Sequence, residues 1–456
     1  MWRWVLIVVA LVSSAAGASA QAETEAAQQF ISISDIHFNP YFDPTLMQRL
    51  EASDVSGWAA IFQSSKIQQP NSYNSDTNYP LFASFLADLK TRAAGARFAT
   101  IAGDFLGHDF PQDFQLYSTD KSEQAYQSFV TKTVQFIATE LQAAVPGLKI
   151  YPALGNNDSD CGDYEITPKG WFLGVFAKAF APSVKSSGFV TQFSPYGYYA
   201  VPAPMPDTTL IGLNTIFFSS NYDNACGTSG VDYGVLELAW LKKQLALARL
   251  RKRHVWLLYH IPPGINVYSS TTGPTACPTP VTMWKTQYTT TFDTLMKRYA
   301  STVSVSLAGH THMDDFRLMA TATSPFAYVH IPPAVSPLFT NNPAYEVMTY
   351  LPAKATIADY AVINFTLNTP APRWALEYSF ASAYGQTAYT PQSIAAVRAA
   401  INSDPTTRAL YIKYYTASNP SSTTITPENE KGYWCGTGAR TPADFTACYC
   451  VTPASP

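Results

Sequence analysis

Charged side chains are scarce in this chain. Asp, Glu, Lys and Arg make up 13% of its 456 residues, which is about half the share in an ordinary soluble domain. The formal net charge is −3, with 29 basic and 32 acidic side chains. Nucleic-acid-binding proteins draw much of their affinity from clustered Lys and Arg, so we expect no nucleic-acid partner. The apolar fraction of 47% excludes a disordered chain and predicts a large core.

Long apolar runs are also missing after the first twenty residues. Residues 4–12 are apolar, follow the basic Arg3, and precede Ala18-Ser19-Ala20, a small-residue pattern that signal peptidases cut. The run is shorter than the ~20 residues that span a bilayer. We expect residues 1–20 to be a cleaved secretory signal, with an uncleaved anchor as the alternative. The mature protein should then be secreted, into an extracellular, periplasmic or vacuole-like compartment, as a monomer without a membrane span.

Cysteine is sparse, and no C-x-x-C pair occurs, which disfavours a zinc ribbon. An even number of cysteines behind a secretory signal predicts up to three disulfides, whose pairing the spacing alone does not determine. Because Cys448 and Cys450 are too close for an easy mutual bond, we expect them to have different partners. The cysteines are Cys161, Cys226, Cys277, Cys435, Cys448 and Cys450.

Short runs of β-branched and aromatic residues end abruptly in polar loops. The runs are residues 30–34, 97–102, 148–154, 209–214, 254–259 and 303–308. Between them lie amphipathic stretches with helical periodicity, at residues 81–94, 118–144 and 233–251. Strands that alternate with helices predict an α/β fold, including the layered α-β-β-α arrangement.

The sequence changes character after about residue 368. Pro370-Ala371-Pro372 is a stiff break, and residues 374–380 form one more strand-like run. Residues 393–402 and 406–417 have helical patterns, and a cysteine-bearing tail follows. We therefore expect a main domain over residues 21–384 and a small helical appendage over residues 385–456.

Two of the polar loops contain carboxylates suited to metal binding. Asp35 and His37 lie two residues apart in an extended segment, so their side chains point to the same side. Gly103 permits a sharp exit from a strand, and the two carboxylate oxygens of Asp104 can bridge two cations. Alone, each pattern is equally typical of a surface loop or a capping turn.

Three further loops offer neutral donors. Asn156 has an amide oxygen, although an Asx-turn uses the same residue type. His260 ends a strand-like run, where a core histidine is the commoner case. His310 and His312, two residues apart after Gly309, are the most specific pattern of the set.

The position that these loops share strengthens the prediction that they bind metal together. Each follows a strand, and ligands in layered α/β folds gather at the carboxyl ends of strands. Nitrogen and oxygen donors of this kind suit two divalent cations, zinc first, with manganese or iron as alternatives. The proposed donors are Asp35, His37, Asp104, Asn156, His260, His310 and His312.

The ordered series Asp-x-His, Gly-Asp, Gly-Asn, His and Gly-His-x-His resembles the calcineurin-like metallophosphoesterases, over residues 31 to about 316. The resemblance implies an α-β-β-α sandwich of two mixed sheets, with two metals at the strand ends. It assigns Asp35, His37 and His312 to the first metal. It assigns Asn156, His260 and His310 to the second metal, with Asp104 bridging the two.

Narrower features are similar to the acid sphingomyelinase-like phosphodiesterases within that family. His108, four residues after the bridging position, corresponds to their proton-donating histidine. The His-Ile-Pro-Pro-Gly of residues 260–264 and the loop of residues 333–345 are also similar. Within that loop, the resemblance implies that Asn341 and Asn342 contact the substrate.

The helical, cysteine-bearing tail is also like that of these phosphodiesterases. The resemblance implies two disulfides, Cys226–Cys277 and Cys435–Cys448. It leaves the partners of Cys161 and Cys450 open.

One position departs from the family pattern. The family has a histidine directly after its Gly-Asn pair, where this chain has Asn157 after Gly155-Asn156. That histidine contacts phosphate in the transition state, whereas Asn157 can donate a hydrogen bond but no proton near neutral pH. We expect Asn157 to be catalytic in this reduced sense. Gly-Asn-Asn-Asp also resembles endopolyphosphatases.

The resemblance therefore implies a secreted phosphodiesterase that uses a metal-bridging hydroxide on nucleotide-type or phospholipid-headgroup diesters. An endopolyphosphatase or phosphomonoesterase is the alternative. A third hypothesis is a secreted binding protein with a merely structural metal. The donor set argues against it, because closed structural zinc sites prefer cysteine-rich ligands.

Overall fold

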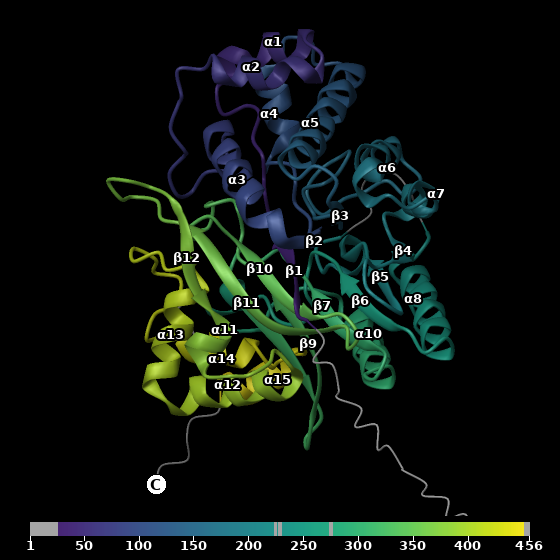
Figure 1. Ribbon diagram of the computed structural model, residues 1–456, viewed down its shortest axis with the longest axis vertical. Helices are drawn as coiled ribbons and strands as arrows, with labels where there is room; N and C mark the ends of the chain where they lie inside the picture. The colour runs from purple at the N-terminus through teal and green to yellow at the C-terminus, as the bar shows by residue number, and fades with distance from the viewer. Residues whose placement is uncertain (1–25, 223–225, 227–229, 273–276, 451–456) are drawn as a thin grey trace, which may run out of the picture.

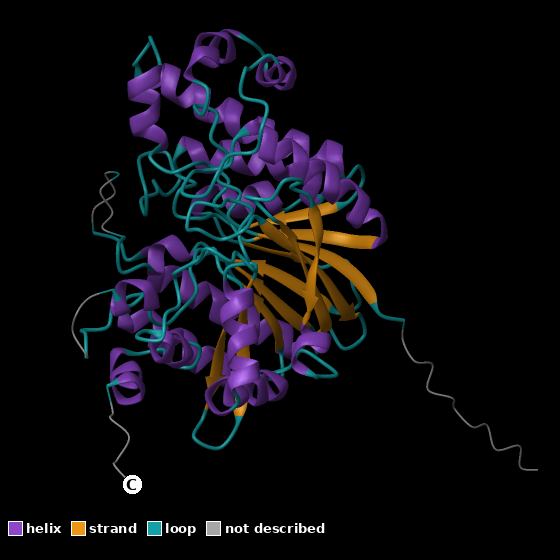
Figure 2. Ribbon diagram, turned by 90° about the vertical axis from the view of Figure 1, so that its left-hand side faces the viewer, coloured by secondary structure: helices purple, strands orange, loops and turns teal. Residues whose placement is uncertain are grey.

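The computed structural model describes residues 26–222, 226, 230–272 and 277–450. Two six-stranded sheets face each other at the centre, and helices cover their outer sides (Figures 1 and 2). The strands of the first sheet are β1 (Gln28–Ile33), β2 (Ala96–Ile101), β3 (Lys149–Pro152), β10 (Ala344–Leu351), β11 (Thr356–Phe365) and β12 (Trp374–Ser379). The strands of the second are β4 (Tyr199–Pro202), β5 (Thr208–Gly212), β6 (His254–Leu258), β7 (Val303–Leu307), β8 (Asp315–Ala320) and β9 (Pro325–Ile331).

Both sheets are mixed. The first has the order β12-β11-β10-β1-β2-β3, in which β1, β2 and β3 are parallel to one another and β10 to β12 are antiparallel. The second has the order β4-β5-β6-β7-β9-β8, with β5, β6, β7 and β9 parallel. The α/β sandwich predicted from the sequence is confirmed, and all six central strand-like runs coincide with strands.

Aromatic side chains join the two sheets. Trp256 of β6 packs against Phe30 of β1, with ring centroids 5.2 Å apart, and its indole N–H donates to the Ala355 carbonyl at 2.8 Å. Phe98 of β2 and Tyr350 of β10 contact the same indole at 5.9 and 5.8 Å. Large rings buried in this way hold the sheets at a fixed separation, because an interior at crystal-like density leaves little freedom to slide.

Helices cover the outer faces. The first sheet and the loops at its strand ends are covered by α1 (Met47–Ala52), α2 (Trp58–Gln63), α3 (Tyr79–Arg92), α4 (Phe110–Tyr117), α5 (Glu123–Ala144) and α6 (Trp171–Val184), while α7 (Phe189–Tyr196) packs against α6 and β4. The second is flanked by α8 (Tyr233–Leu250) and α10 (Thr286–Arg298), and α9 (Val267–Thr271) contacts α14 (Glu430–Gly436). The helix expected over residues 118–144 begins later, at Glu123, because the Ser122 side chain caps it by accepting from the Ala125 N–H. Among the described residues, no helix is both long and apolar enough to cross a bilayer.

The carboxyl-terminal helices gather at the lower left of Figure 1, in contact with strands of both sheets. They are α11 (Phe380–Tyr384), α12 (Pro391–Ser403), α13 (Pro405–Tyr415), α14 (Glu430–Gly436) and α15 (Pro442–Tyr449). Ile394 and Val397 of α12 and Phe445 of α15 are buried in the same apolar cluster as the sheet residues. This part of the chain therefore shares the main core. The signal expected over residues 1–20 lies outside the described residues.

The disulfides correct one predicted pairing. The structure joins Cys161 to Cys226 and Cys277 to Cys450, so the Cys226–Cys277 bond inferred from the resemblance is wrong. The physical reason is position: the Cα atoms lie 6.1 Å apart in the first observed pair and 5.1 Å in the second, both within the reach of a disulfide. The third bond joins Cys435 to Cys448, as the resemblance implied.

Candidate metal centre

The polar loops meet where the parallel strands of both sheets end, in the tangle of loops beside the strands in Figure 2. Backbone hydrogen bonds tie the loops together: the Asp35 N–H donates to the Gly103 carbonyl at 3.1 Å, and the His37 N–H donates to the Asp104 carbonyl at 2.9 Å. Across the sandwich, the Gly309 N–H donates to the His260 carbonyl at 2.8 Å. The seven donors predicted from the sequence thus lie in one place.

A first group of donors consists of Asp35, His37 and His312. The Nε2 atoms of His37 and His312 are 3.0 Å apart, and Asp35 Oδ1 lies 3.7 and 3.4 Å from them. All three side chains are at most 1% exposed. Donors held about 2.0–2.1 Å from a tetrahedral cation are separated by roughly 3.3 Å, so these spacings fit one metal ion.

A second group consists of Asn156, His260 and His310. Asn156 Oδ1 lies 3.0 Å from His260 Nε2 and 2.8 Å from His310 Nδ1, and the two imidazole nitrogens are 3.3 Å apart. These spacings again match a single cation. The set combines a neutral amide with two imidazoles, which leaves the charge of a bound cation available to a substrate anion.

Asp104 belongs to both groups. Its Oδ2 atom lies 3.3 Å from His37 Nε2 and 3.1 Å from His260 Nε2. The carboxylate is 2% exposed. Asp35 also comes near both groups, but its Oδ1 atom is 3.9 Å from His260 Nε2, farther than Asp104 Oδ2. The position of Asp104 between the two groups is what a bridge between two cations requires.

The protonation of the cluster also indicates a cation site. Burial opposes a charged His37, but the neighbouring carboxylate of Asp104 outweighs it and raises the pKa of His37 to about 10. The same opposition raises the pKa of His260 to about 9, whereas burial and the charge on His260 lower the pKa of His310 to about 3. Without a cation, His37 and His260 are therefore protonated whereas His310 is not, so metal binding should release protons from His37 and His260.

In His37 and His260, the ring nitrogen that points away from the cluster, Nδ1, is held by a backbone carbonyl, and Nε2 faces the other donors. His37 Nδ1 donates to the Leu106 carbonyl at 3.0 Å, and His260 Nδ1 donates to the Ala102 carbonyl at 2.6 Å. With its proton on Nδ1, each ring directs the Nε2 lone pair into the cluster. The donors present thus fit two metal ions.

The glycines of the blocks are needed for close approach. A Cβ added at Gly155 would lie 2.0 Å from Asp104 Oδ1, and one at Gly309 would lie 2.1 Å from Ser34 Oγ. Gly103 has φ +97° and a built Cβ would meet the Gly155 backbone at 2.6 Å. The strand exits can converge only because these positions lack side chains.

Several donors have a left-handed backbone. Asp35, Asp104 and His312 have φ values of 50°, 56° and 63°, and His37 and His310 have 43° and 75°. Such conformations cost of order 1–3 kcal/mol each for non-glycine residues and persist where the surroundings enforce them. This concentration of strained residues at one point marks the strand ends as a functional site.

Asp158 is a supporting residue that the sequence reading did not assign. Its carboxylate accepts hydrogen bonds from the backbone N–H groups of Asp104, Phe105 and Leu106 at 2.8–3.1 Å, and from Gly155 at 2.9 Å. Asp158 thereby holds the loop that contains Asp104 against the loop that contains Asn156. Burial and the charge of Asp104 raise the pKa of Asp158 to about 7.

His108 lies at the rim of the cluster. Its ring stacks on His37 with centroids 4.2 Å apart, and its side chain is 28% exposed. Asp76, a buried residue not singled out from the sequence, accepts from the His108 backbone N–H at 2.7 Å and from Nδ1 at 3.0 Å. Asp76 therefore fixes the ring so that Nε2 is the nitrogen available to a substrate.

Asn157 lies against the shared carboxylate. Its backbone N–H donates to Asp104 Oδ1 at 2.8 Å and its side-chain amide donates to Asp104 Oδ2 at 3.0 Å. The side chain is thus placed at the centre of the cluster, 7% exposed. A small hollow lined by Gly107, Asp109, Asn157 and Asp163 opens beside it.

Asn341 and Asn342, the substrate contacts that the resemblance implies, are buried in the structure, and their contact with substrate stays a prediction. Both side chains are at most 1% exposed. Asn341 Nδ2 donates to the Ser336 carbonyl at 2.9 Å, and Asn342 Nδ2 donates to the Ala417 carbonyl at 2.9 Å. The Asn341 amide thus holds the loop internally, and the Asn342 amide joins it to the turn after α13.

The same loop brings a different residue to the site. The Ser336 N–H donates to the Asp35 carbonyl at 3.0 Å, which anchors the loop beside the donors. Phe339 is 46% exposed, and its ring meets His312 edge-on at 4.6 Å and His108 at 6.1 Å. An exposed phenyl ring next to these histidines forms an apolar wall at the site.

No protein-family model matches the chain. Sphingomyelinase phosphodiesterase D of Dictyostelium discoideum is 24% identical over 389 residues, which cover 78% of this chain and 80% of that protein. Cyclic GMP-AMP phosphodiesterase SMPDL3A of Rattus norvegicus is 23% identical, covering 80% and 79%. Human acid sphingomyelinase-like phosphodiesterase 3b is 24% identical, covering 67% and 69%. A solved dimetal phosphatase from Danio rerio covers 74% of this chain with 12% identity and a TM-score of 0.39, a likeness too weak to carry an argument.

The relatives are phosphodiesterases, and the similarity extends over most of both chains. In the structure of this chain, nitrogen and oxygen donors gather in two groups at the strand ends. This protein is accordingly a metal-dependent hydrolase of phosphoric esters, and it is similar over most of its length to acid sphingomyelinase-like phosphodiesterases.

Proposed function

We propose that the chain hydrolyses phosphodiesters whose phosphate bears a nucleoside or a phospholipid-type headgroup. The observation that carries the proposal is the position of Asp104 Oδ2 between two complete donor groups. Asp35, His37 and His312 would hold one cation, Asn156, His260 and His310 the other, and Asp104 both. Zinc suits this nitrogen and oxygen set, and we propose it over manganese or iron.

When bound, such a cation pair neutralises phosphate oxygens and lowers the pKa of water. The chain supplies the remaining functions. His108, held by Asp76, is placed to give a proton to the leaving oxygen. The Asn157 amide can donate a hydrogen bond at the centre of the cluster but supplies no proton.

The relatives' names refer to both sphingomyelin and cyclic GMP-AMP, so the substrate class is a proposal for this chain. Purified protein assayed on sphingomyelin, nucleotide diesters, monoesters and inorganic polyphosphate should show its highest kcat/KM on a diester. The Asn157 position favours one alternative, since the resemblance to endopolyphosphatases includes it. Activity confined to polyphosphate would replace the proposal with that alternative.

Phe339 should select for large substituents on the phosphate. We expect Phe339→Ala to lower kcat/KM on a nucleotide diester by about tenfold, because stacking of a base on an aromatic ring contributes ~1–3 kcal/mol. A diester with only aliphatic substituents, which has no ring to stack on Phe339, should lose much less. Steady-state kinetics on the two esters measure the difference, and equal losses on both would remove Phe339 from substrate selection.

We also propose that the protein acts after export, as a monomer. Its three disulfides are stable in oxidising compartments and rare in the cytosol. Fractionation of the producing cells, with detection of mature protein lacking the first residues, tests this. Reduced, full-length protein retained in the cytosol would contradict it.

A further inference from the structure

The loop that follows Asn156 reaches back to the second donor group at two points. Asp163 Oδ1 accepts a hydrogen bond from Asn156 Nδ2 at 2.7 Å. The Tyr164 hydroxyl lies 3.2 Å from His310 Nε2, and the two rings meet edge-on at 5.8 Å. Two consecutive side chains of this loop, residues 159–165, thus contact two of the three donors in that group.

The Asp163 contact fixes the orientation of the Asn156 amide, and the Tyr164 contact fixes the tautomer of His310. The Asp163 carboxylate can only accept, so it holds the NH₂ end of the Asn156 amide and turns Oδ1 toward His260 and His310. His310 directs Nδ1 into the cluster, so its proton belongs on Nε2, where the Tyr164 hydroxyl can accept it. This tautomer is opposite to that of His37 and His260, and no backbone carbonyl enforces it.

One residue of the loop has an unfavourable backbone conformation, and hydrogen bonds hold it in place. Tyr164 has φ 58°, a left-handed conformation that is unfavourable for a bulky residue. Its backbone N–H donates to the Asn156 carbonyl at 3.1 Å. Ser159 Oγ accepts from the N–H groups of Cys161 at 3.1 Å and Gly162 at 3.2 Å.

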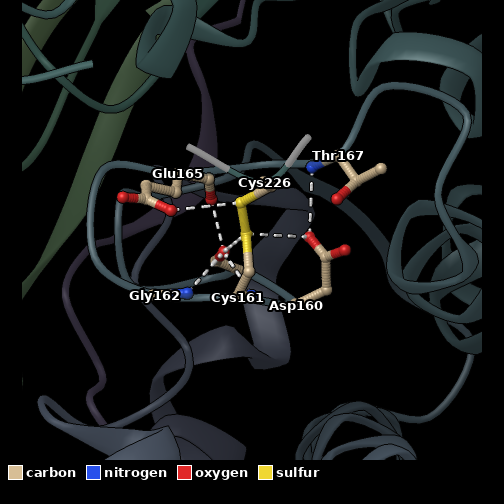
Figure 3. The surroundings of a disulfide bond; sticks show 7 residues. Asp160, Cys161, Gly162, Glu165, Thr167 and Cys226 are labelled. Carbon is tan, nitrogen blue, oxygen red and sulfur yellow. Dashed lines mark hydrogen bonds between the residues drawn. A yellow bond between two sulfur atoms is a disulfide. The ribbon is translucent and has the colours of Figure 1, made fainter. Parts of the chain in front are cut away.

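The Cys161–Cys226 disulfide adds the constraint from outside the loop. It joins residues 65 positions apart, and Figure 3 shows it inside the curve of the loop, with Asp160 and Glu165 on either side. Cys226 Sγ lies 3.3 Å from Glu165 Oε2. The loop is therefore closed both by its own hydrogen bonds and by a covalent tie.

We infer that this disulfide-tied loop is a positioning element for one half of the metal centre: Asp163 and Tyr164 set the affinity of the Asn156, His260 and His310 group and leave the Asp35, His37 and His312 group unaffected. The inference rests on the proposed metal assignment. It adds two positioning residues and a covalent tie that the sequence reading did not identify. Outer partners of metal ligands typically change metal affinity by about 10–100-fold.

The test is a calorimetric titration of metal-free protein with Zn²⁺, with bound zinc counted by mass spectrometry. Asp163→Ala should weaken the second equivalent by about 10–100-fold and leave the first unchanged. Asp163→Asn keeps an acceptor oxygen but can also turn its NH₂ group inward, so it should be intermediate. Tyr164→Phe, which keeps the ring and loses the hydroxyl, should weaken the second equivalent less than Asp163→Ala.

Asp160→Ala is the matched control. Asp160 lies in the same loop and accepts from the Thr167 N–H at 3.1 Å, but it contacts no donor of the second group. This variant should bind both zinc equivalents like the unmodified protein. A general loosening of the loop would instead weaken zinc binding in Asp160→Ala and Asp163→Ala alike and would overturn the positioning role.

The covalent tie is tested with paired double variants. Cys161→Ala with Cys226→Ala should lose the second zinc equivalent, whereas Cys277→Ala with Cys450→Ala should keep it. Thermal unfolding of each variant verifies that it is folded. If the unmodified protein binds fewer than two zinc ions, the metal assignment fails; if it binds two and every loop variant does so equally well, only this inference fails.

Discussion

Replacing Asp104 with asparagine is expected to lower kcat/KM on a diester by about a thousandfold or more. Asp104 Oδ2 lies within 3.3 Å of a donor nitrogen in each group. An amide has one oxygen and no charge, so it cannot serve two cations equally. Loss of about 4 kcal/mol of electrostatic stabilisation corresponds to a factor of about a thousand in rate.

The matched control is Asp109→Asn. Asp109 belongs to the same Gly-Asp block and is exposed at the start of α4, and its side chain makes no capping hydrogen bond. Its left-handed backbone, φ 51°, is one that asparagine tolerates. This variant should retain nearly full activity and metal content. Similar activity in the Asp104 and Asp109 variants would mean that no shared carboxylate is needed.

Removal of His108 should produce a loss that depends on the leaving group. We expect His108→Ala to lower kcat by about 10²–10⁴-fold on a diester with an alkoxide leaving group, which is the usual contribution of a general acid. A nitrophenolate needs no proton to leave, so a nitrophenyl ester should lose far less. Comparison of kcat on the two esters at one pH measures this difference.

A control histidine is available outside the site. His254 of β6 is half-buried and its Nδ1 contacts Ser304 Oγ at 3.1 Å. His254→Ala should affect both esters equally and slightly. If the His108 variant behaves in the same way, with equal losses on both esters, the proton must come from elsewhere and Asp76 would have no catalytic purpose.

The central strands were predictable because they are buried on both faces. Runs such as residues 254–259 are almost continuously apolar, and four of the five residues of β6 are buried. β9 and β10 escaped notice because they contain His330 and Glu346. These two side chains are completely buried and pair with each other, with Nε2 2.8 Å from the carboxylate oxygens. A polar residue whose partner lies on another strand interrupts the apolar pattern on which the prediction depends.

The donors could be found from the sequence because ligand chemistry and strand ends are both local features. Their supports are not local. Asp76 contacts His108 from 32 residues away, and Tyr164 contacts His310 from 146 residues away. Nothing in the spacing of the sequence indicates such pairs, because they depend on how the loops fold over the strand ends.

The differences between the predicted and observed positions of side chains in loops have the same origin. Asn341 and Asn342 occur in a loop that does border the site, but only the fold shows that their amides turn inward and that Phe339 turns outward. The pairing of Cys226 with Cys161 likewise depends on a loop of this chain, residues 159–165, whose position the resemblance did not determine. Resemblance located the segments correctly, whereas the direction of individual side chains required the tertiary structure.

The claim on which the catalytic account depends is that a single carboxylate is shared between two metal ions. The most direct measurement is a crystal structure of the zinc-loaded protein, with anomalous scattering used to locate the metals. The account predicts two zinc peaks per chain, one among Asp35, His37 and His312 and one among Asn156, His260 and His310, both in contact with Asp104. A single peak, or two peaks of which one lies away from Asp104, would contradict it.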